Sequence, residues 1–201
     1  MKAKRKKRSP KKGRGGKILF LLILIGMIAF IFYLFRQDII NSLKPWLEKW
    51  SVVEKKKEVL LYFSDSEGEY LIGERRKILE KRDVKEEAKE AINELINGPK
   101  GKLIRTLPPR TKLLTLQINE AGVAKVNFNQ ALSKDHPRGS TAEMMTVYSI
   151  VNSLALNFPQ IKRVQILIDG KPIETIAGHL SLKQPIFPKS DLIKRQIKSN
   201  N

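Results

Sequence analysis

Residues Ser140–Gly170 read STAEMMTVYSIVNSLALNFPQIKRVQILIDG, and this stretch decides the fold. Apolar residues recur every three or four positions in its first part, which predicts a helix over 140–157 with a wide apolar face. Apolar and polar residues alternate over 163–168, as they do in a half-buried strand. Asp169-Gly170 is a strong signal for a tight hairpin turn. The stretch therefore predicts a helix that lies against a sheet, followed by a strand of that sheet.

The chain upstream and downstream of this stretch carries the same two periodicities. They predict strands over 59–63 and 69–72, a helix over 83–97, hairpin strands over 112–118 and 123–129, and a return strand over 172–176. The order of elements is β-α-β-β-α-β. It predicts an α+β domain in which two helices pack on one face of a mostly antiparallel sheet.

Both predicted helices begin at residues that favour helix N-termini. Asp83 is placed to cap the amide of Glu86, and Ser140 with Glu143 has the spacing of a capping box. The other side of the first helix carries mixed charge, and we interpret it as a solvated surface rather than a catalytic carboxylate pair. That side comprises Lys85, Glu86, Glu87, Lys89, Glu90 and Glu94.

The N-terminal region contains an apolar segment, Ile18–Phe35, which reads ILFLLILIGMIAFIFYLF and carries no charge. A transmembrane helix needs roughly 17–25 such residues, whereas a buried core helix of this length normally keeps a polar face. Ten Lys and Arg residues precede the segment within residues 1–17. By the positive-inside rule we expect a single pass through the plasma (inner) membrane, with the N-terminus cytoplasmic and the later chain extracytoplasmic or periplasmic.

A cleavable signal peptide is the competing interpretation of this segment. Signal peptides have a shorter apolar core and small residues before the cleavage site. Here the core is long and runs directly into Phe35 and Arg36, so we expect an uncleaved signal anchor. Trp46 and Trp50 then share one helical face, which indicates either a position at the membrane interface or a simple amphipathic linker.

These features divide the chain into five parts. They are a basic cytoplasmic tail (1–17), a transmembrane helix (18–35), a juxtamembrane linker (36–57), the α+β domain (58–187) and a flexible basic tail (188–201). Lys and Arg number 39 against 20 Asp and Glu, a net charge of +19, and the N-terminal tail supplies about half of it. We interpret this tail as a topology signal lying against anionic headgroups. It has no aromatic residue to stack on bases, so we expect no nucleic-acid partner.

Composition and motifs favour a protein without catalytic activity or a bound cofactor. The absence of cysteine excludes disulfides, thiolate metal sites and a cysteine nucleophile. The sequence contains none of the dinucleotide, phosphate-loop, zinc-protease or nucleophile-elbow motifs. Asp135, His136 and Ser140 are neighbours and suggest a nucleophile, but a helix cap explains Ser140 better and a turn explains His136 better.

Two further groups of residues suggest metal ions only weakly. His179 has no second histidine nearby, and a structural hydrogen bond explains it better than a metal does. Asp65, Glu67 and Glu69 alternate in a turn, a spacing that can bind calcium loosely. They lack the full set of oxygen ligands of an EF-hand, so we expect a plain polar turn and no bound metal.

The loop before the second helix is the candidate binding site. It contains His136, Arg138, Gly139 and Ser140, and it places an arginine next to a helix N-terminus. That geometry favours anions, so we treat the loop as a candidate interaction or anion-binding site. A loop that is merely shaped by proline and glycine is the alternative.

Three stretches of the sequence resemble one known family. They are LLYFSDSEGEYL (60–71), HPRGSTAEMMTVYSIVNSLALNFPQIKRVQILIDG (136–170) and ETIAGHLSLKQPI (174–186). Together they are similar to the GerMN domain of sporulation and spore germination proteins, over about 130 residues. The most specific pieces are Gly139-Ser140-x-x-Glu143, Val147–Asn152, Ile168–Gly170 and Gly178-His179.

The resemblance implies a non-enzymatic module of the bacterial cell envelope. It also implies an α+β fold similar to the ring-building domains of sporulation proteins that assemble between two membranes. The chain differs from family members that carry two such domains on a lipid anchor, since it has one domain, a membrane helix and no cysteine.

Three hypotheses about function follow. The first is an anchored interaction or assembly module that binds envelope proteins or copies of itself, in sporulation, germination, cell-wall or division complexes. The second is a binding module for peptidoglycan or another envelope polymer, because the remaining basic excess suits an anionic polymer. The third is a hydrolase centred on Asp135, His136 and Ser140. We expect the first.

Overall fold

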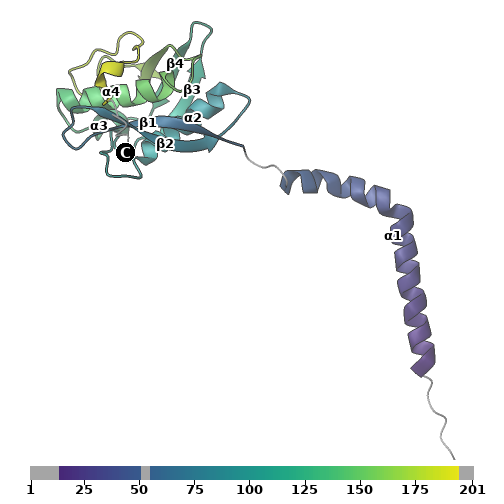
Figure 1. The fold of residues 1–201 in the computed structure, drawn as a ribbon. Coiled ribbons are helices and arrows are strands. Elements are labelled where there is room, and N and C mark those ends of the chain that lie inside the picture. The colour runs from purple at the N-terminus through teal and green to yellow at the C-terminus, as the bar shows by residue number, and fades with distance from the viewer. Residues whose placement is uncertain (1–13, 51–54, 195–201) are drawn as a thin grey trace, which may run out of the picture. The chain divides into compact units, whose positions relative to one another are not determined.

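The computed structural model describes residues 14–50 and 55–194. The chain divides into two compact units, Met1–Val53 and Glu54–Asn201, and each is considered by itself. In the first unit, helix α1 spans Arg14–Trp50 (Figure 1). Its apolar part, Leu19–Gln37, has a mean hydropathy of 2.5, and none of it is buried within the part of the chain that the structure describes.

Helix α1 is longer than the membrane helix predicted over 18–35, because the predicted linker continues as helix as far as Trp50. The predictions for the N-terminal tail fall largely on residues 1–13, which lie outside the described residues. The side chains of Trp46 and Trp50 also lie outside the described part of the structure, so their expected position at a membrane interface stays a prediction.

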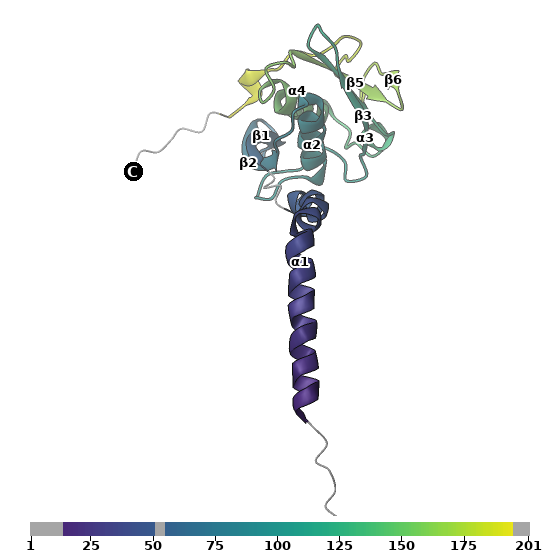
Figure 2. The same ribbon diagram turned by 90° about the vertical axis from the view of Figure 1, so that its right-hand side faces the viewer.

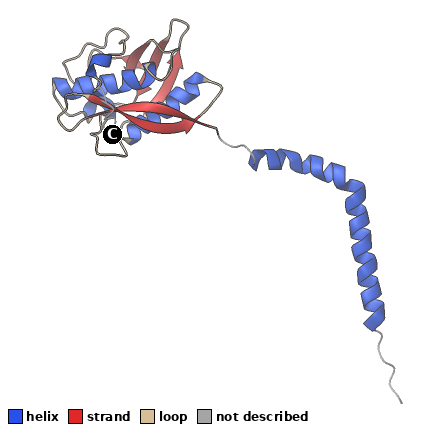
Figure 3. Ribbon diagram, viewed as in Figure 1, coloured by secondary structure: helices blue, strands red, loops and turns tan. Residues whose placement is uncertain are grey.

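The second unit contains the α+β fold that the sequence predicts (Figure 3). Its elements are β1 (Lys56–Ser64), β2 (Leu71–Leu79), α2 (Val84–Asn97), β3 (Leu113–Ile118), β4 (Val123–Phe128), α3 (Ala131–Lys134), α4 (Ser140–Ala155), β5 (Arg163–Ile168), β6 (Lys171–Pro172) and the 3-10 helix η1 (Ser190–Leu192). The predicted class and order of elements are confirmed, with the short helix α3 as an addition.

The strands form two sheets rather than one continuous sheet. β1 and β2 make an antiparallel hairpin, and the larger sheet has the order β3-β4-β5-β6. Within it only β4 and β5 run parallel, because α3 and α4 carry the chain back across the sheet between them. Helices α2 and α4 each contact strands of both sheets. Figure 2 shows α2 between the hairpin and the larger sheet.

Three strands differ in extent from the prediction. β1 covers Lys56–Ser64 where the sequence predicts 59–63, and β2 covers Leu71–Leu79, well beyond the predicted 69–72. β6 (Lys171–Pro172) shares only Pro172 with the return strand predicted over 172–176. The turn before β6 is as predicted, since Asp169 and Gly170 both have positive φ, at 48° and 79°. The missed part of β2 reads GERRKIL, whose charges conceal the alternation of a strand.

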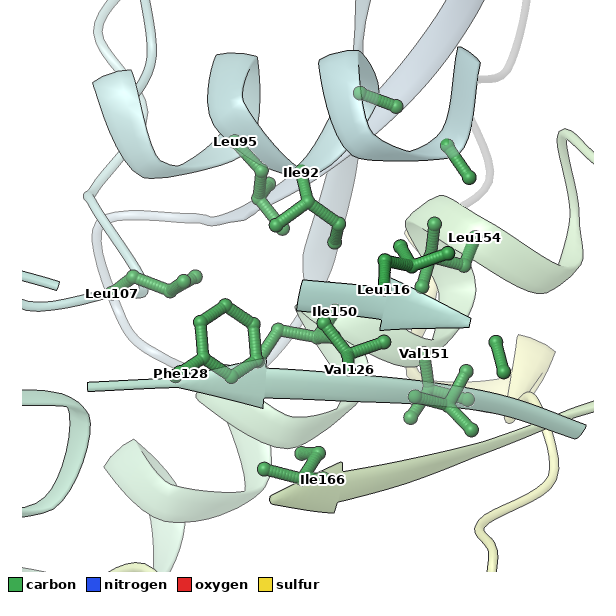
Figure 4. Packing of buried hydrophobic residues seen from close by; sticks show 14 of the residues in the cluster. Ile92, Leu95, Leu107, Leu116, Val126, Phe128, Ile150, Val151, Leu154 and Ile166 are labelled. Atoms are coloured by element: carbon green, nitrogen blue, oxygen red, sulfur yellow. The ribbon is translucent and has the colours of Figure 1, made fainter. Parts of the chain in front are cut away.

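A single main core joins both sheets to both helices. Ile92 and Leu95 point from α2 toward Leu116 of β3 and Phe128 of β4 (Figure 4). The same cluster includes residues of β1, α4 and β5, and its largest fully buried side chains are phenylalanines, leucines and isoleucines. These are Phe63, Phe128, Phe158, Leu61, Leu95, Leu107, Leu116, Leu132, Ile78, Ile92 and Ile150. The second unit therefore has the hydrophobic core that an independently folding domain needs.

Polar side chains of α4 cover the free edge of β1. Ser149 and Ser153, with Asn157 just past the helix, recur every four residues. Asn157 Oδ1 accepts from Leu60 N–H at 2.8 Å, and its Nδ2 donates to the Leu60 carbonyl at 2.6 Å. Ser153 Oγ accepts from Tyr62 N–H at 3.0 Å, and Ser149 Oγ donates to the Tyr62 carbonyl. The middle of β1 is thus hydrogen-bonded on both edges.

The charged side of α2 is not the solvated surface that the sequence predicts. Glu87 has a side chain only 5% exposed and accepts from the amide of Lys81 at 2.9 Å. Glu90 accepts from the amide of the last residue of β2 at 2.9 Å. Glu94 pairs with the buried Arg76 at 2.8 Å. These carboxylates fasten the helix to the hairpin, so the prediction is wrong for three of its residues.

Residues 189–194 are part of the packed unit, whereas the sequence predicts a flexible tail from residue 188. The side chain of Asn152 accepts from Lys189 N–H at 2.9 Å and donates to its carbonyl at 3.0 Å. After η1, the Lys194 amide donates to the Leu71 carbonyl at 2.9 Å, next to a bridge between Leu71 and Ile193. Residues 195–201 lie outside the described residues.

Candidate functional site

A pocket of about 480 Å³ lies where the turn of the β1–β2 hairpin meets the start of α4. Its lining comes from three segments: residues 64–68, residues 104–106, and residues 137–142 with 145–146. The lining contains both signs of charge, because it includes the carboxylates Asp65 and Glu67 as well as Arg105 and Arg138. Three of the four candidate loop residues, Arg138, Gly139 and Ser140, line this pocket.

The N-terminus of α4 opens into this pocket without a side-chain cap. Gly139 is the N-cap residue, with φ of 124°, and no side chain hydrogen-bonds to the helix start. The first amides of a helix have no partner within the helix, and they favour negative charge. The predicted capping box of Ser140 and Glu143 is wrong, since Ser140 is exposed and Glu143 is turned into the protein. Asp83 does cap α2, through the amide of Lys85 at 2.8 Å rather than that of Glu86.

Glu143 holds a distant loop against α4. Its side chain is fully buried, and its two oxygens accept from the amides of Ile176, Ala177 and His179 at 2.7, 2.9 and 2.8 Å. The His179 ring nitrogen Nδ1 lies 3.3 Å from Oε2. Burial alone would raise the pKa of Glu143, but the amide donors, that of Ala177 first, hold it below its ordinary value. Glu143 is therefore a buried anion whose charge is satisfied by backbone.

His136 faces the interior, unlike the rest of the candidate loop. It is 7% exposed, and its Nε2 lies 2.9 Å from Thr146 Oγ1. Because the Thr146 hydroxyl donates to the Thr106 carbonyl, Nε2 must donate, which assigns the neutral tautomer protonated there. Burial lowers the pKa of His136, against the opposing effects of nearby carbonyls and of Glu143. His136 thus positions the loop and does not present a charge to the pocket.

Asp65 organises the opposite wall of the pocket. It is 4% exposed, and its Oδ1 accepts from the amides of Glu69 and Tyr70 at 2.9 and 3.2 Å. Burial raises the pKa of Asp65, but the amides of Tyr70 and Glu69 together with Lys194 bring it below its ordinary value. Glu67 and Glu69 are exposed. Within residues 14–50 and 55–194, no three His, Asp or Glu side chains gather as a metal ion would require.

The residues of the hydrolase hypothesis are engaged separately. Asp135 accepts two hydrogen bonds from Arg110, at 2.8 and 2.6 Å, while His136 is bonded to Thr146. Ser140 is exposed at the start of α4. No hydrogen bond joins these three residues in the described part of the chain. The arrangement supplies a polar pocket for binding, with an uncapped helix start and an arginine on one side and carboxylates on the other.

Sequence reasoning missed the two residues that shape this site most. The sequence predicts that Glu143 is half of a capping box and that Asp65 belongs to an ordinary polar turn. The sequence does contain a signal for Glu143. It lies next to the apolar face of α4, and Ser140 already stands at the helix start as a possible cap, so the glutamate is free to bind elsewhere. The Ser149, Ser153 and Asn157 series, spaced four apart in an apolar helix, likewise marked a polar contact with another element.

The comparisons with known proteins identify one family. The model of the Germane family, described as sporulation and spore germination, matches residues 60–174. That span covers more than half of the chain and most of the second unit, so the resemblance to GerMN domains is confirmed. No curated protein matches the chain.

Solved structures give the same result for the fold. The tandem GerMN domains of the sporulation protein GerM from Bacillus subtilis align with a TM-score of 0.52 at 17% identity, over 68% of this chain and 48% of that one. The chain thus spans about half of that two-domain structure. A protein from Clostridium perfringens described as a lipoprotein is 27% identical over 70% of this chain and 92% of its own, with a TM-score of 0.48.

Proposed function

The chain belongs to the Germane family of sporulation and spore germination domains, and on that premise we propose that it is a membrane-anchored interaction module of the bacterial cell envelope. In this proposal α1 crosses the plasma membrane once, residues 1–17 remain in the cytoplasm, and the second unit works outside it. There the unit binds envelope proteins or copies of itself and catalyses no reaction.

The observation that carries the proposal is the uncovered apolar surface of α1. Over Leu19–Gln37 the helix has a mean hydropathy of 2.5, and among residues 14–50 and 55–194 nothing buries it. Leaving a single large apolar side chain in water rather than burying it costs about 1.5–3 kcal/mol. A helix of this kind is stable in lipid, where its own backbone hydrogen bonds are complete. The ten basic residues before it support the cytoplasmic placement of the N-terminus.

Single-cysteine labelling tests the topology, since the natural chain contains no cysteine. Ser9→Cys places a thiol in the N-terminal tail, and Ser181→Cys places one at an exposed position of the second unit. A membrane-impermeant maleimide applied to intact cells should label only the second variant. Labelling of the first variant would overturn the orientation of α1, and release of the second unit into the medium with a cleaved N-terminus would overturn the anchor.

Site-specific photocrosslinking tests the interaction role. A photoreactive residue at Arg138, on the pocket rim, should give covalent adducts with envelope proteins or with a second copy. The same residue at Lys125, exposed on β4 and away from the pocket lining, is the matched control. If neither position yields an adduct in living cells, the proposal of a protein-binding module fails.

A polymer-binding role is the second candidate, and the pocket gives it a specific basis. The uncapped start of α4 and the exposed Arg138 both favour an anionic group. Purified second unit should then sediment with cell-wall material at low salt and be released at high salt. Arg138→Glu should weaken this binding and Lys125→Glu should not. Sedimentation that is absent at low salt excludes the polymer.

A further inference from the structure

One face of the β1–β2 hairpin carries exposed basic residues at the end where the chain enters the second unit. Alternate residues of the two strands lie on this face: Lys56, Glu58 and Leu60 on β1, and Arg75 and Lys77 on β2, all of them exposed. The strand register sets Glu58 opposite Lys77 and Leu60 opposite Arg75. We call these five residues the basic hairpin face.

The charges on this face are not balanced. Its one carboxylate, Glu58, lies 3.2 Å from Arg75, in a pair whose side chains are 52% and 75% exposed. Such an exposed pair is screened by water and holds its partners weakly. Lys56 and Lys77 have no ion-pair partner among the described residues. Leu60, 39% exposed, lies between these cations, so the face combines positive charge with an aliphatic side chain.

The position of this face along the chain limits how far it can lie from Trp50, which follows the apolar part of α1 by 13 residues, or about 20 Å of helix. Only residues 51–54 separate the end of α1 at Trp50 from Lys55. An extended chain of that length reaches at most about 18 Å. Lys81 and Arg82 follow β2 at the same end of the hairpin and are also exposed. The chain therefore joins α1 to the most basic end of the hairpin.

We propose that the basic hairpin face docks on anionic lipid headgroups of the membrane that holds α1. This inference rests on the proposed function, because it requires α1 to be a retained anchor. Each basic residue close to an anionic membrane surface strengthens binding roughly fivefold. An exposed leucine among cations is the composition of a surface that lies at the headgroup boundary.

The same charges argue against a second copy as the occupant. Two copies that met through this face would bring together two surfaces that each carry three cations, Lys56, Arg75 and Lys77, and one carboxylate, so like charges would repel across the contact. Lysine on an edge strand also discourages pairing with another strand. An anionic membrane meets the face with the opposite sign of charge.

The test uses the full-length chain in nanodiscs, made either of phosphatidylcholine alone or with roughly one-third phosphatidylglycerol. Leu60→Cys carries an environment-sensitive fluorophore on the basic hairpin face, and Leu114→Cys, an exposed leucine of β3, carries it on the other sheet as a control. A headgroup spin-labelled lipid quenches whichever fluorophore lies at the surface. The probe at residue 60 should be quenched more strongly in the anionic discs, and salt near 1 M should abolish the difference.

Charge variants of the same chain make the result specific. Lys56→Gln with Lys77→Gln should lower the ratio of docked to undocked chains roughly 25-fold. Lys125→Gln with Lys171→Gln removes the same charge from exposed positions on the larger sheet and should leave quenching unchanged. Circular dichroism of each variant verifies that it is folded.

Each other outcome has a distinct meaning. Equal quenching in the two lipids, or equal losses from the two pairs of substitutions, overturns the docking proposal while leaving the anchor intact. Protein that does not incorporate into nanodiscs of either lipid composition overturns the anchor itself. If the fluorescence of the probe at residue 60 does not depend on lipid composition but changes when soluble polyphosphate is added, the ligand of the face is a polyanionic polymer and the lipid proposal is wrong.

Discussion

Replacement of Glu143 by glutamine tests the central contact of the candidate site. The carboxylate accepts three backbone amides in a fully buried position. Hydrogen bonds to a charged group contribute about 1.5–3 kcal/mol each, against about 1 kcal/mol for neutral pairs. Glutamine keeps one acceptor oxygen for Ile176 and Ala177 but sets an N–H donor against the amide of His179. Turning two charged hydrogen bonds into neutral ones costs about 0.5–2 kcal/mol each and losing the third costs about 1.5–3 kcal/mol, so we expect a loss of about 4 kcal/mol in the free energy of unfolding.

The pH dependence separates this charge effect from simple repacking. The folded pKa of Glu143 is depressed, so its contribution is fully present above the unfolded pKa, about 4.3, and is lost as pH falls through the lower folded value. Asp65, Glu74 and Glu87 are also depressed and give a slope that both proteins share. The difference between natural chain and variant should therefore shrink as pH falls below about 4.

Urea unfolding of the second unit measures both effects. Both tryptophans precede this unit, so far-UV circular dichroism is the suitable signal. Glu174→Gln is the matched control, because Glu174 is 78% exposed in its pair with Lys183 and should change stability by less than about 0.5 kcal/mol. Amide exchange in residues 176–179 should also accelerate in the Glu143 variant. A loss below about 1 kcal/mol, or a difference independent of pH, refutes the reasoning.

Further substitutions test the contacts that the sequence did not reveal. Ser153→Ala leaves the buried Tyr62 amide without its acceptor and should cost about 1–3 kcal/mol in urea unfolding; a neutral result would mean that water replaces the serine. Ser140→Ala should change stability by less than about 0.5 kcal/mol, because Ser140 caps nothing, whereas a true cap would cost about 0.5–2 kcal/mol. Gly122→Ala should cost more in thermal unfolding than Gly170→Ala. Both have positive φ, but only at Gly122 would the new Cβ lie 2.9 Å from a backbone oxygen, so equal losses would contradict the close approach.

The periodicity of apolar residues predicts helices and strands that bury one face in the core and expose the other to solvent. The helix over 83–97 and the hairpin strands near 112–118 and 123–129 were located from the sequence almost to the residue. β2 was not, because one of its buried positions is occupied by Arg76. The desolvation cost of burying that guanidinium is offset by its ion pairs with Glu74 and Glu94, at 2.6 and 2.8 Å. The compensating Glu94 comes from α2, which a strand pattern cannot include.

The sequence predicts the candidate site in outline. Its prediction of a capping box at Ser140 and Glu143 is wrong for one physical reason. A glutamate three residues after a serine at a helix start has two equally good uses: to reach back to the cap residue, or to bind a loop elsewhere. Here the loop at 176–179 supplies three amide donors, more than a capping box offers, so the carboxylate turns inward. The same orientation of Glu143 leaves the start of α4 uncapped and open to the pocket. In this chain Gly139-Ser140-x-x-Glu143 therefore leaves a helix start free, because the carboxylate that a capping box would use is bonded to the amides of another loop.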